Sequence, residues 1–252
     1  MNLTKLVLST NGFVGILLIN KLFELGYNPN QLIVWCSSAH DNQDLKRFCQ
    51  QYHINVTDIT TVADMLTVVD ADLLLSVSGV DLLFPKHILD QFRFGGINLH
   101  TADSQKYRGR WMVSWCLINN ESTVGYTWHR MNEKFDTGNI LLQHFFDISP
   151  IDTAFSLNIK IRNHAINQLD TILSDPGHPG TLPITIGCYY SKKVPFDGLI
   201  ADDWNPTQIE QFIRAMYCPP HQPAKLKIGN SHYLINNIDE YYAIKKISVK
   251  KN

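Results

Sequence analysis

Long hydrophobic runs are missing from this sequence, and so is any strong bias of charge. No apolar stretch approaches the ~20 residues that a membrane-spanning helix needs. The 22 lysines and arginines nearly balance the 23 aspartates and glutamates, and the net charge of −1 indicates neither a nucleic-acid nor a membrane partner. The N-terminal residues hold one lysine and a short apolar run, which predicts a first strand rather than a signal peptide. We therefore expect a soluble, cytoplasmic protein.

Cysteine pairs with metal-binding spacing are missing as well. The five cysteines are odd in number and none forms a CxxC pair, which favours buried free thiols in a reducing compartment. The ten histidines never fall at short metal-ligand spacings, so we expect no metal. Walker, GxSxG and HExxH motifs are absent, and residues 11–15 offer GxxG rather than the GxGxxG of a dinucleotide site.

Short buried strands alternate with helices over the first hundred residues. The hydrophobic pattern predicts strands over residues 5–9, 32–36, 54–56, 72–77 and 96–99, with helices over 13–25 and 42–52. This alternation predicts an α/β fold with a Rossmann-like, mostly parallel sheet. Ligands of such sheets bind at the carboxyl ends of the strands.

The second half of the chain has a different pattern. Residues 122–130 alternate, which predicts a strand with one wetter face, and residues 140–146 are its expected neighbour. Asp152 or Thr153 is expected to cap a helix that extends to about residue 173. This helix would carry a stripe of Leu157, Ile161, Ala165, Leu169 and Leu173. The turn-rich residues 174–180 predict a linker.

The linker divides the chain into two expected domains. Residues 1–180 would form the catalytic domain, and residues 181–252 a small mixed α/β or β-rich segment. Because this segment is too small for a secure core of its own, we expect it to pack on the first domain or to form the contact of a homodimer.

Three short motifs lie between residues 95 and 138. Asn98 and His100 stand two apart at a strand end, so both side chains face one way, and they offer an amide donor and a near-neutral base. Residues 106–111 combine three basic side chains with aromatics, which suits an anion and a flat ring as well as a solvated loop. Asp136 precedes a Thr-Gly turn, which by itself is an ordinary Asx turn.

Together these motifs resemble the folate-dependent formyltransferases. That family carries Asn-x-His, then Tyr-Arg-Gly, then Asp-Thr-Gly, and the same elements stand here at residues 98–100, 107–109 and 136–138. Residues 125–127 are similar to the strand before the aspartate, and the resemblance extends over residues 1–175. The family usually has Leu-Leu-Pro where this chain has Asp103-Ser104-Gln105. That loop faces the acceptor, so the departure concerns the acceptor rather than the reaction.

The resemblance implies formyl transfer from 10-formyltetrahydrofolate to an amine. Asn98 would donate to the developing oxyanion, and His100 would accept the proton of the attacking amine. Asp136 would orient or charge His100, and could relay a proton to the leaving nitrogen. The pterin of the donor is expected against the loop after the fourth strand and the turn before Asp136, with contacts from Ser78, Gly79, Val80, Asp81, Phe84 and Lys134.

The C-terminal sequence bears on the acceptor. Residues 189–220 resemble the sugar-nucleotide formyltransferases and the bacterial enzyme that formylates UDP-aminoarabinose. Residues 186–252 hold 9 basic and 6 acidic side chains, a net +3, whereas a module that grips tRNA phosphates would want more charge. We expect a dTDP-linked 4-amino-4,6-dideoxyhexose, such as dTDP-4-amino-4,6-dideoxyglucose, destined for a surface polysaccharide such as an O-antigen. Its expected contacts are Lys106, Tyr107, Arg108, Arg110 and Trp111.

Two alternatives remain open on the sequence. The first is a formyltransferase acting on methionyl-tRNA or phosphoribosylglycinamide, against which the short chain and the tail sequence argue. The second is an inactive folate-binding or regulatory protein, which would have no need of Asn98, His100 and Asp136 together.

Overall fold

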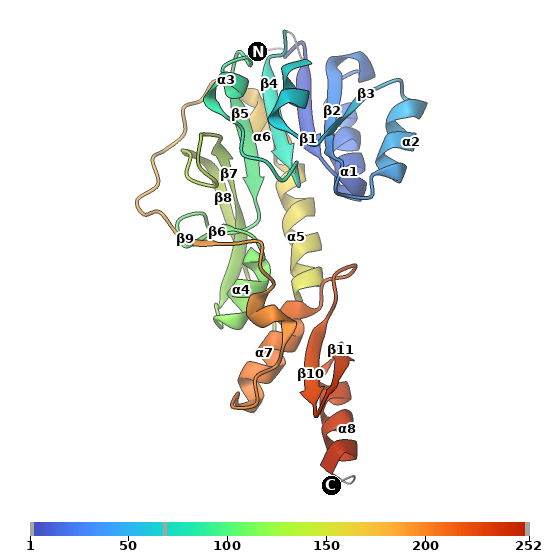
Figure 1. Ribbon diagram of the computed structural model, residues 1–252. Coiled ribbons are helices and arrows are strands. Elements are labelled where there is room, and N and C mark those ends of the chain that lie inside the picture. Colours follow the sequence, from blue (N-terminus) through green and yellow to red (C-terminus); the bar gives the residue numbers. More distant parts are fainter. Residues whose placement is uncertain (1–2, 68–69, 250–252) are drawn as a thin grey trace.

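A seven-stranded sheet forms the centre of the computed structural model, which describes residues 3–67 and 70–249 (Figure 1). The strand order is β3-β2-β1-β4-β5-β7-β8. The first five strands are parallel to one another, β7 pairs antiparallel with β5, and β8 pairs antiparallel with β7. The bounds are β1 Leu6–Thr10, β2 Leu32–Ser37, β3 Asn55–Ile59, β4 Leu73–Val77, β5 Gly96–His100, β7 Thr123–Arg130 and β8 Ile140–Asp147. The predicted α/β fold with a mostly parallel sheet is confirmed.

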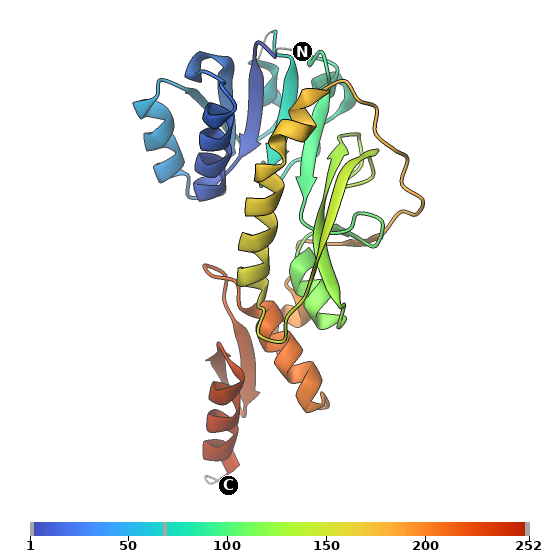
Figure 2. The same ribbon diagram turned by 180° about the vertical axis from the view of Figure 1, so that it is seen from behind.

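Helices cover both faces of the sheet, which is why its parallel strands are continuously hydrophobic. The larger core cluster includes side chains of α1 (Gly12–Glu24), α2 (Gln43–Gln51), α4 (Met112–Ile118), α5 (Ala154–Asn167) and α6 (Leu169–Ser174). The smaller cluster, on the other face, includes side chains of η2 (Val62–Thr67) and α3 (Lys86–Leu89). A short 3-10 turn, η1 (Pro29–Gln31), leads into β2. Seen from behind, α5 runs lengthwise across the middle of the molecule (Figure 2).

The prediction that β7 has one wetter face is wrong, because residues 124–129 are all buried. On one face, the indole nitrogen of Trp128 donates to the carbonyl of Ala165 in α5 at 3.2 Å. On the other face, the hydroxyl of Thr127 donates to the carbonyl of Ala102 at 2.8 Å. The loop after β5 therefore covers the face of β7 that the alternating sequence pattern predicted to be exposed to solvent.

The helix expected over residues 153–173 is two helices. Gln168 has φ −91° and ψ 9°, which ends α5 before α6 begins at Leu169. The expected N-cap is present, since the hydroxyl of Thr153 accepts from the backbone N–H of Ser156 at 3.2 Å. The predicted stripe is nevertheless buried throughout, from Leu157 to Leu173.

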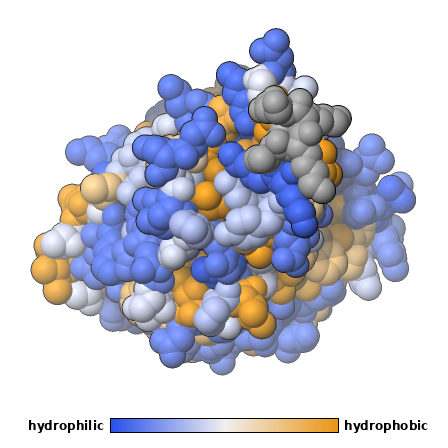
Figure 3. Space-filling model, turned by 90° about the horizontal axis from the view of Figure 1, so that it is seen from below, coloured by the Kyte–Doolittle hydropathy of each residue, from blue (hydrophilic) through white to orange (hydrophobic). Residues whose placement is uncertain are grey.

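The chain pairs with the first domain again, in a separate two-stranded sheet, before it forms the tail. β9 (Cys188–Tyr190) pairs in parallel with β6 (Tyr107–Gly109), and only then follow η3 (Pro195–Gly198), α7 (Pro206–Met216), β10 (Ala224–Ile228), β11 (Ser231–Ile235) and α8 (Ile238–Val249). The last elements project away from the sheet, at the opposite end from the N-terminus (Figure 1). Viewed from below, this end shows hydrophobic side chains scattered among hydrophilic ones (Figure 3).

The tail has a small core of its own. Phe212 is 1% exposed and joins a separate cluster with residues of β10, β11 and α8. α7 also packs on α4 and contacts α5, so the tail is attached to the first domain at β6, α4 and α5. The predicted boundary at residue 180 stays a prediction, and the contact of β9 with β6 places at least residues 188–190 with the sheet domain.

The five cysteines are free thiols in the structure, of which Cys36, Cys49 and Cys116 are buried. Cys188 is exposed, against the expectation, because β9 lies at the surface. None of the helices in the described part of the chain has the length and apolar character of a membrane span. The cytoplasmic location stays a prediction.

Candidate active site

Asn98, His100 and Asp136 meet at the carboxyl end of β5. The Nδ1 atom of His100 lies 3.4 Å from Oδ1 of Asp136, and the amide nitrogen of Asn98 lies 3.5 Å from the same oxygen. The side chains of His100 and Asp136 are 6% and 10% exposed. The structure thus brings the three predicted residues together, and their chemical roles stay predictions.

The Asp-Thr-Gly turn explains how Asp136 reaches β5. Asp136 has φ 54°, in the left-handed region, which turns its carboxylate back toward the sheet. A side chain at Gly138 would place its Cβ 1.7 Å from the carbonyl oxygen of Arg130. Because only glycine fits there, the turn can lie directly against the end of β7.

A second histidine, His129, belongs to this group. It stands opposite Asn98 in the pairing of β5 with β7 and is 3% exposed. Its Nε2 atom lies 3.1 Å from the amide nitrogen of Asn98 and 3.4 Å from Oδ1 of Asp136. His129 was not predicted from the sequence. Its position next to Trp128 places its side chain on the other face of β7, and this alternation could have pointed to it.

The surroundings of Asp136 keep its carboxylate ionised. Burial acts to raise its pKa, but His100, His129 and the backbone N–H of Gly109, which donates to Oδ2 at 2.9 Å, together hold the pKa well below the ordinary range of an aspartate. A permanent negative charge therefore lies between two imidazole rings.

Hydrogen bonds define the tautomer of His100. Its Nε2 atom lies 2.8 Å from the carbonyl oxygen of Tyr107, and since a carbonyl can only accept, Nε2 carries the proton. The free lone pair is then on Nδ1, which faces Asp136. A proton taken up at Nδ1 would produce an imidazolium held between a carbonyl and a carboxylate, so His100 is arranged to act as a base.

Hydrogen bonds also orient the amide of Asn98. The Nδ1 atom of His129 lies 2.7 Å from the carbonyl of Arg130 and donates to it. In the neutral ring Nε2 accepts from the amide of Asn98, whereas a protonated Nε2 would donate to Asp136. The second amide hydrogen of Asn98 has only the 3.5 Å contact with Asp136, which is long for a hydrogen bond. That hydrogen is available to a developing oxyanion.

The loop after β4 holds most of the residues predicted to bind the donor. Ser78 has φ 51°, and the amide of Asn11 donates to the carbonyls of Ser78 and Gly79 at 2.8 Å each. Val80 and Phe84 are buried in the smaller core cluster, where Phe84 stacks on a tryptophan. The side chains of these two residues therefore pack mainly in the core and fix the loop, and their part in donor binding stays a prediction.

Asp81 and Lys134 are the more accessible members of the predicted donor set. Asp81 is half-buried and makes an ion pair with Arg110. Lys134 is exposed on the turn before Asp136. Their part in donor binding stays a prediction.

All five residues predicted to contact the acceptor have partners within the protein. Tyr107 is buried and donates its hydroxyl to Glu121 at 2.8 Å, and Lys106 pairs with Glu121 at 3.3 Å. Arg108 donates to the carbonyls of Gly187 and Phe135 at 2.7 and 3.2 Å. These contacts bind the loop to the protein, and the substrate contacts of all five residues stay a prediction.

The tail supplies neighbours to this loop that sequence analysis did not name individually. Gly109 has φ 95°, and a Cβ there would lie 2.1 Å from the carbonyl oxygen of Tyr190, so β6 and β9 can pair only with glycine at this position. Trp111 donates its indole N–H to the carbonyl of Lys192 at 3.3 Å and stacks edge-on with His221, 5.0 Å between ring centroids.

The unusual Asp103-Ser104-Gln105 loop also contacts the returning chain. The side-chain oxygen of Gln105 accepts from the backbone N–H of Ile184 at 2.9 Å, and the carbonyl of Ser104 accepts from Gly187 at 3.3 Å. The departure from the family pattern thus anchors the segment that leads into β9.

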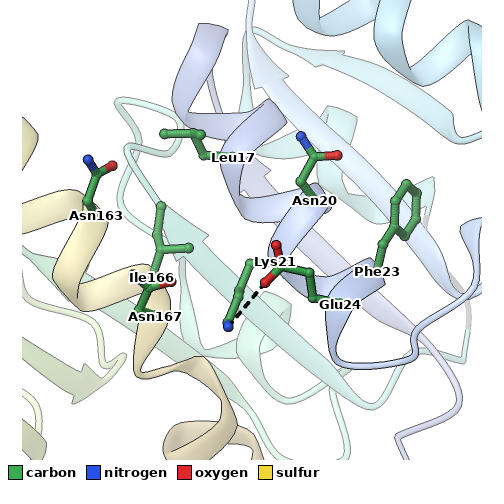
Figure 4. A pocket seen from close by; sticks show the side chains of 8 residues that line it. All are labelled: Leu17, Asn20, Lys21, Phe23, Glu24, Asn163, Ile166 and Asn167. Atoms are coloured by element: carbon green, nitrogen blue, oxygen red, sulfur yellow. Dashed lines mark hydrogen bonds and ion pairs between the residues drawn. The ribbon is translucent and has the colours of Figure 1, made fainter.

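A cavity of about 640 Å³ lies elsewhere, between α1 and α5 (Figure 4). Its lining residues include none of those predicted for catalysis, donor or acceptor, and Lys21 and Glu24 pair with each other inside it at 3.3 Å. We assign no ligand to it. Within residues 3–67 and 70–249, no cluster of three or more His, Cys, Asp or Glu side chains is arranged to hold a metal ion.

Comparisons with known proteins agree with the site geometry in pointing to formyl transfer. A model of the formyl transferase family matches residues 37–173. GDP-perosamine N-formyltransferase of Brucella melitensis biotype 1 is 39% identical over 177 residues, which cover 69% of this chain and 68% of that protein.

Solved structures share the fold over nearly the whole chain. A sugar N-formyltransferase from Shewanella sp FDAARGOS_354 has a TM-score of 0.76 at 19% identity and covers 92% of this chain and 96% of that one. WlaRD, a sugar 3N-formyl transferase described in the presence of dTDP and 5-N-formyl-THF, has a TM-score of 0.74 at 20% identity, covering 92% and 85%. The site geometry, the family match and the 39% identity together establish that the chain belongs to the formyl transferase family and is an enzyme that transfers formyl groups.

Proposed function

We propose that the protein transfers the formyl group of 10-formyltetrahydrofolate to the amine of a nucleotide-linked amino sugar. The observation that carries this proposal is the ionised Asp136 between His100 and His129, beside an amide of Asn98 whose second hydrogen makes only a long contact, 3.5 Å, with Asp136. A binding protein has no need of a base, a charged partner and an oxyanion donor at one strand end.

The reaction balances with these residues alone. The unprotonated amine attacks the formyl carbon, a C–N bond forms, and the carbonyl oxygen becomes an oxyanion to which Asn98 donates. His100 takes the proton of the attacking amine at Nδ1, and Asp136 stabilises the resulting imidazolium. The oxyanion then collapses, the bond to the folate nitrogen breaks, and that nitrogen leaves with the proton that His100 took from the amine, which returns His100 to its neutral form.

The donor fits the edge of the sheet beside Asn98. Ser76 of β4 is the register partner of Asn98, so the loop that begins at Ser78 lies next to the reacting centre. Ser78 and Gly79 present backbone to this edge, and a Cβ at Gly79 would lie 2.4 Å from the hydroxyl of Ser9. Backbone groups of this kind suit the hydrogen-bonding edge of a flat heterocycle such as a pterin.

The choice of acceptor rests on the relatives. The Brucella melitensis protein is named for a GDP-linked sugar, and WlaRD was described with dTDP. Both support a nucleotide-linked amino sugar, while the sequence-based expectation names a dTDP-linked 4-amino-4,6-dideoxyhexose for a surface polysaccharide. The 39% identity favours testing a GDP-linked sugar with equal weight.

A side-by-side assay tests the function. We would measure formylation of dTDP-4-amino-4,6-dideoxyglucose, GDP-perosamine and methionyl-tRNA at two salt concentrations. A sugar nucleotide offers only a diphosphate, so its reaction should depend weakly on salt, whereas tRNA affinity would fall with a log–log slope of about −0.7 to −0.9 per contacted phosphate. Robust formylation of tRNA alone would overturn the acceptor. Calorimetric folate binding without turnover of any amine would instead indicate a binding protein.

Replacing His129 by alanine is expected to lower kcat about 10-fold or more, because the amide of Asn98 loses the acceptor that orients it. His129→Gln, whose side chain can still accept a hydrogen bond, should recover part of the rate. Steady-state kinetics of the two variants decide this, with thermal unfolding as the check on folding. Equal losses in both variants would argue that His129 has no orienting role.

Replacing Asn11 by alanine is expected to raise the KM for the folate donor several-fold, because the turn at Ser78 and Gly79 loses two hydrogen bonds of about 1 kcal/mol each. The KM for the acceptor should change little. Kinetics with each substrate varied in turn measure both constants. A rise in the acceptor KM alone would contradict the assignment of this loop to the donor.

We propose that the protein is a homodimer joined through its tail. Phe212 and Tyr241 are buried within the tail, but Tyr233, Leu234, Tyr242 and Ile247 are 41–59% exposed. Light scattering at micromolar concentration should give twice the chain mass, and Tyr242→Glu should shift it to the monomer. A monomer mass for the unaltered protein would end this proposal.

A further inference from the structure

Three basic groups from three separate segments converge on the carboxylate of Asp81. Arg110, which follows β6, makes an ion pair with Oδ1. Lys192, which follows β9, lies 3.8 Å from Oδ2, and His40, which follows β2, lies 4.0 Å from the same oxygen. Two permanent positive charges thus share one negative charge, and the group has an excess of positive charge at neutral pH.

This ion cluster adjoins the catalytic residues. The backbone N–H of Gly109 donates to Asp136, and Arg110 is the next residue along the chain. An amino sugar whose amine reaches His100 would hold its diphosphate about one sugar ring away. The backbone N–H of Arg110 donates to the carbonyl of Tyr190 at 3.1 Å, so Arg110 lies where the tail joins this loop.

The neighbours of Arg110 are suited to a nucleotide. Trp111 presents an indole held by the carbonyl of Lys192 and by the ring of His221. Burial, together with the positive charges of His40, Arg162 and Arg110, lowers the pKa of His221.

The contacts of Asp81 are open to solvent. The side chains of Asp81, Arg110 and Lys192 are 27%, 39% and 68% exposed. Ion pairs of this exposure are weak and screened by salt. An arginine, by contrast, binds two phosphate oxygens at once, so a diphosphate can replace a single carboxylate here.

We propose that Arg110 and Lys192 form the subsite for the diphosphate of the acceptor, and that Asp81 occupies this subsite as an internal counter-ion until the substrate displaces it. The inference rests on the proposed function and deepens it. In the free enzyme Asp81 ties the loop after β4 to the loop after β6.

The test compares Asp81→Asn, Arg110→Gln and the double variant. Removing the counter-ion should lower the acceptor KM about 3- to 10-fold at low ionic strength and leave the folate KM unchanged. Arg110→Gln should raise the acceptor KM about 10-fold or more, and in that background Asp81→Asn should have a smaller effect than in the unaltered protein, because only Lys192 is left for it to free. Asp90→Asn is the matched control, since Asp90 pairs with Lys86 at 2.7 Å in α3.

Calorimetry with dTDP and with GDP gives a readout that needs no turnover. Tighter binding of either nucleotide to Asp81→Asn, with Asp90→Asn unchanged, supports the counter-ion. Unchanged or weaker nucleotide binding overturns it, as does a raised folate KM, which would make Asp81 a donor contact. If the unaltered protein binds a nucleotide yet formylates no amino-sugar nucleotide, the proposed function fails, while the calorimetric comparison still decides the role of Asp81.

Discussion

Replacing His100 by asparagine is expected to lower kcat by about 10²–10⁴-fold, the usual contribution of a positioned general base. The variant keeps a polar side chain at the end of β5, but it cannot take a proton at the position of Nδ1, 3.4 Å from Asp136. The measurement is kcat with both substrates saturating. His87→Asn, at an exposed histidine in α3, is the matched control and should retain the full rate.

Folding must be shown to survive in the same preparation. Thermal unfolding and circular dichroism of His100→Asn should match those of the unaltered protein within a few degrees, because the change removes one hydrogen bond to the carbonyl of Tyr107. A rate near that of the unaltered enzyme would remove His100 from the mechanism.

Replacing Asp136 by asparagine is expected to lower kcat by about 10²–10⁴-fold as well, because a buried carboxylate that holds a catalytic imidazole contributes at that scale. The amide keeps an oxygen for the N–H of Gly109 but has no charge to stabilise an imidazolium at His100. Single-turnover rates measure the chemical step directly. A variant that lost only substrate affinity, with an unchanged single-turnover rate, would contradict this role.

The same substitution carries a prediction for stability against pH. The folded protein holds the pKa of Asp136 well below its ordinary value of about 3.9, so the unfolded chain binds the proton more readily. The stabilisation is therefore fully present above the ordinary pKa and declines as the pH falls below it. Urea unfolding should show the unaltered protein most favoured over Asp136→Asn near pH 7, and less so at about pH 3.5. A difference independent of pH would contradict the ionised state.

The sheet could be predicted because its parallel strands are buried on both faces and therefore read as short hydrophobic runs. Residues 73–77 contain three consecutive leucines and form β4 as expected. β7 was harder, because the burial of Thr127 depends on a loop that begins 25 residues earlier in the chain. The break at Gln168 was also invisible, since the hydrophobic stripe continues across it without interruption.

The site was predictable where the spacing of two residues along a strand alone determines which way their side chains point. Asn98 and His100 share a face because they are two apart on a strand. His129 needed the pairing register of β5 with β7, which no local pattern encodes. Likewise, residues 106–108 looked suited to a ligand, yet the partner of Lys106 and Tyr107 is Glu121 in a later loop. Long-range partners decide whether a charged loop is free to bind.

The pairing of β6 with β9 also has a consequence for how such a chain can be recombined. Asn98, His100, His129 and Asp136 are all encoded before the linker, yet the loop beside them is backed by a strand from beyond it. Gly109 admits no side chain at the crossing, so the two segments must change together. The tail therefore cannot be exchanged on its own. A chimera that carries the tail of a relative has to join the two sequences before residue 184, whose backbone N–H donates to the side chain of Gln105.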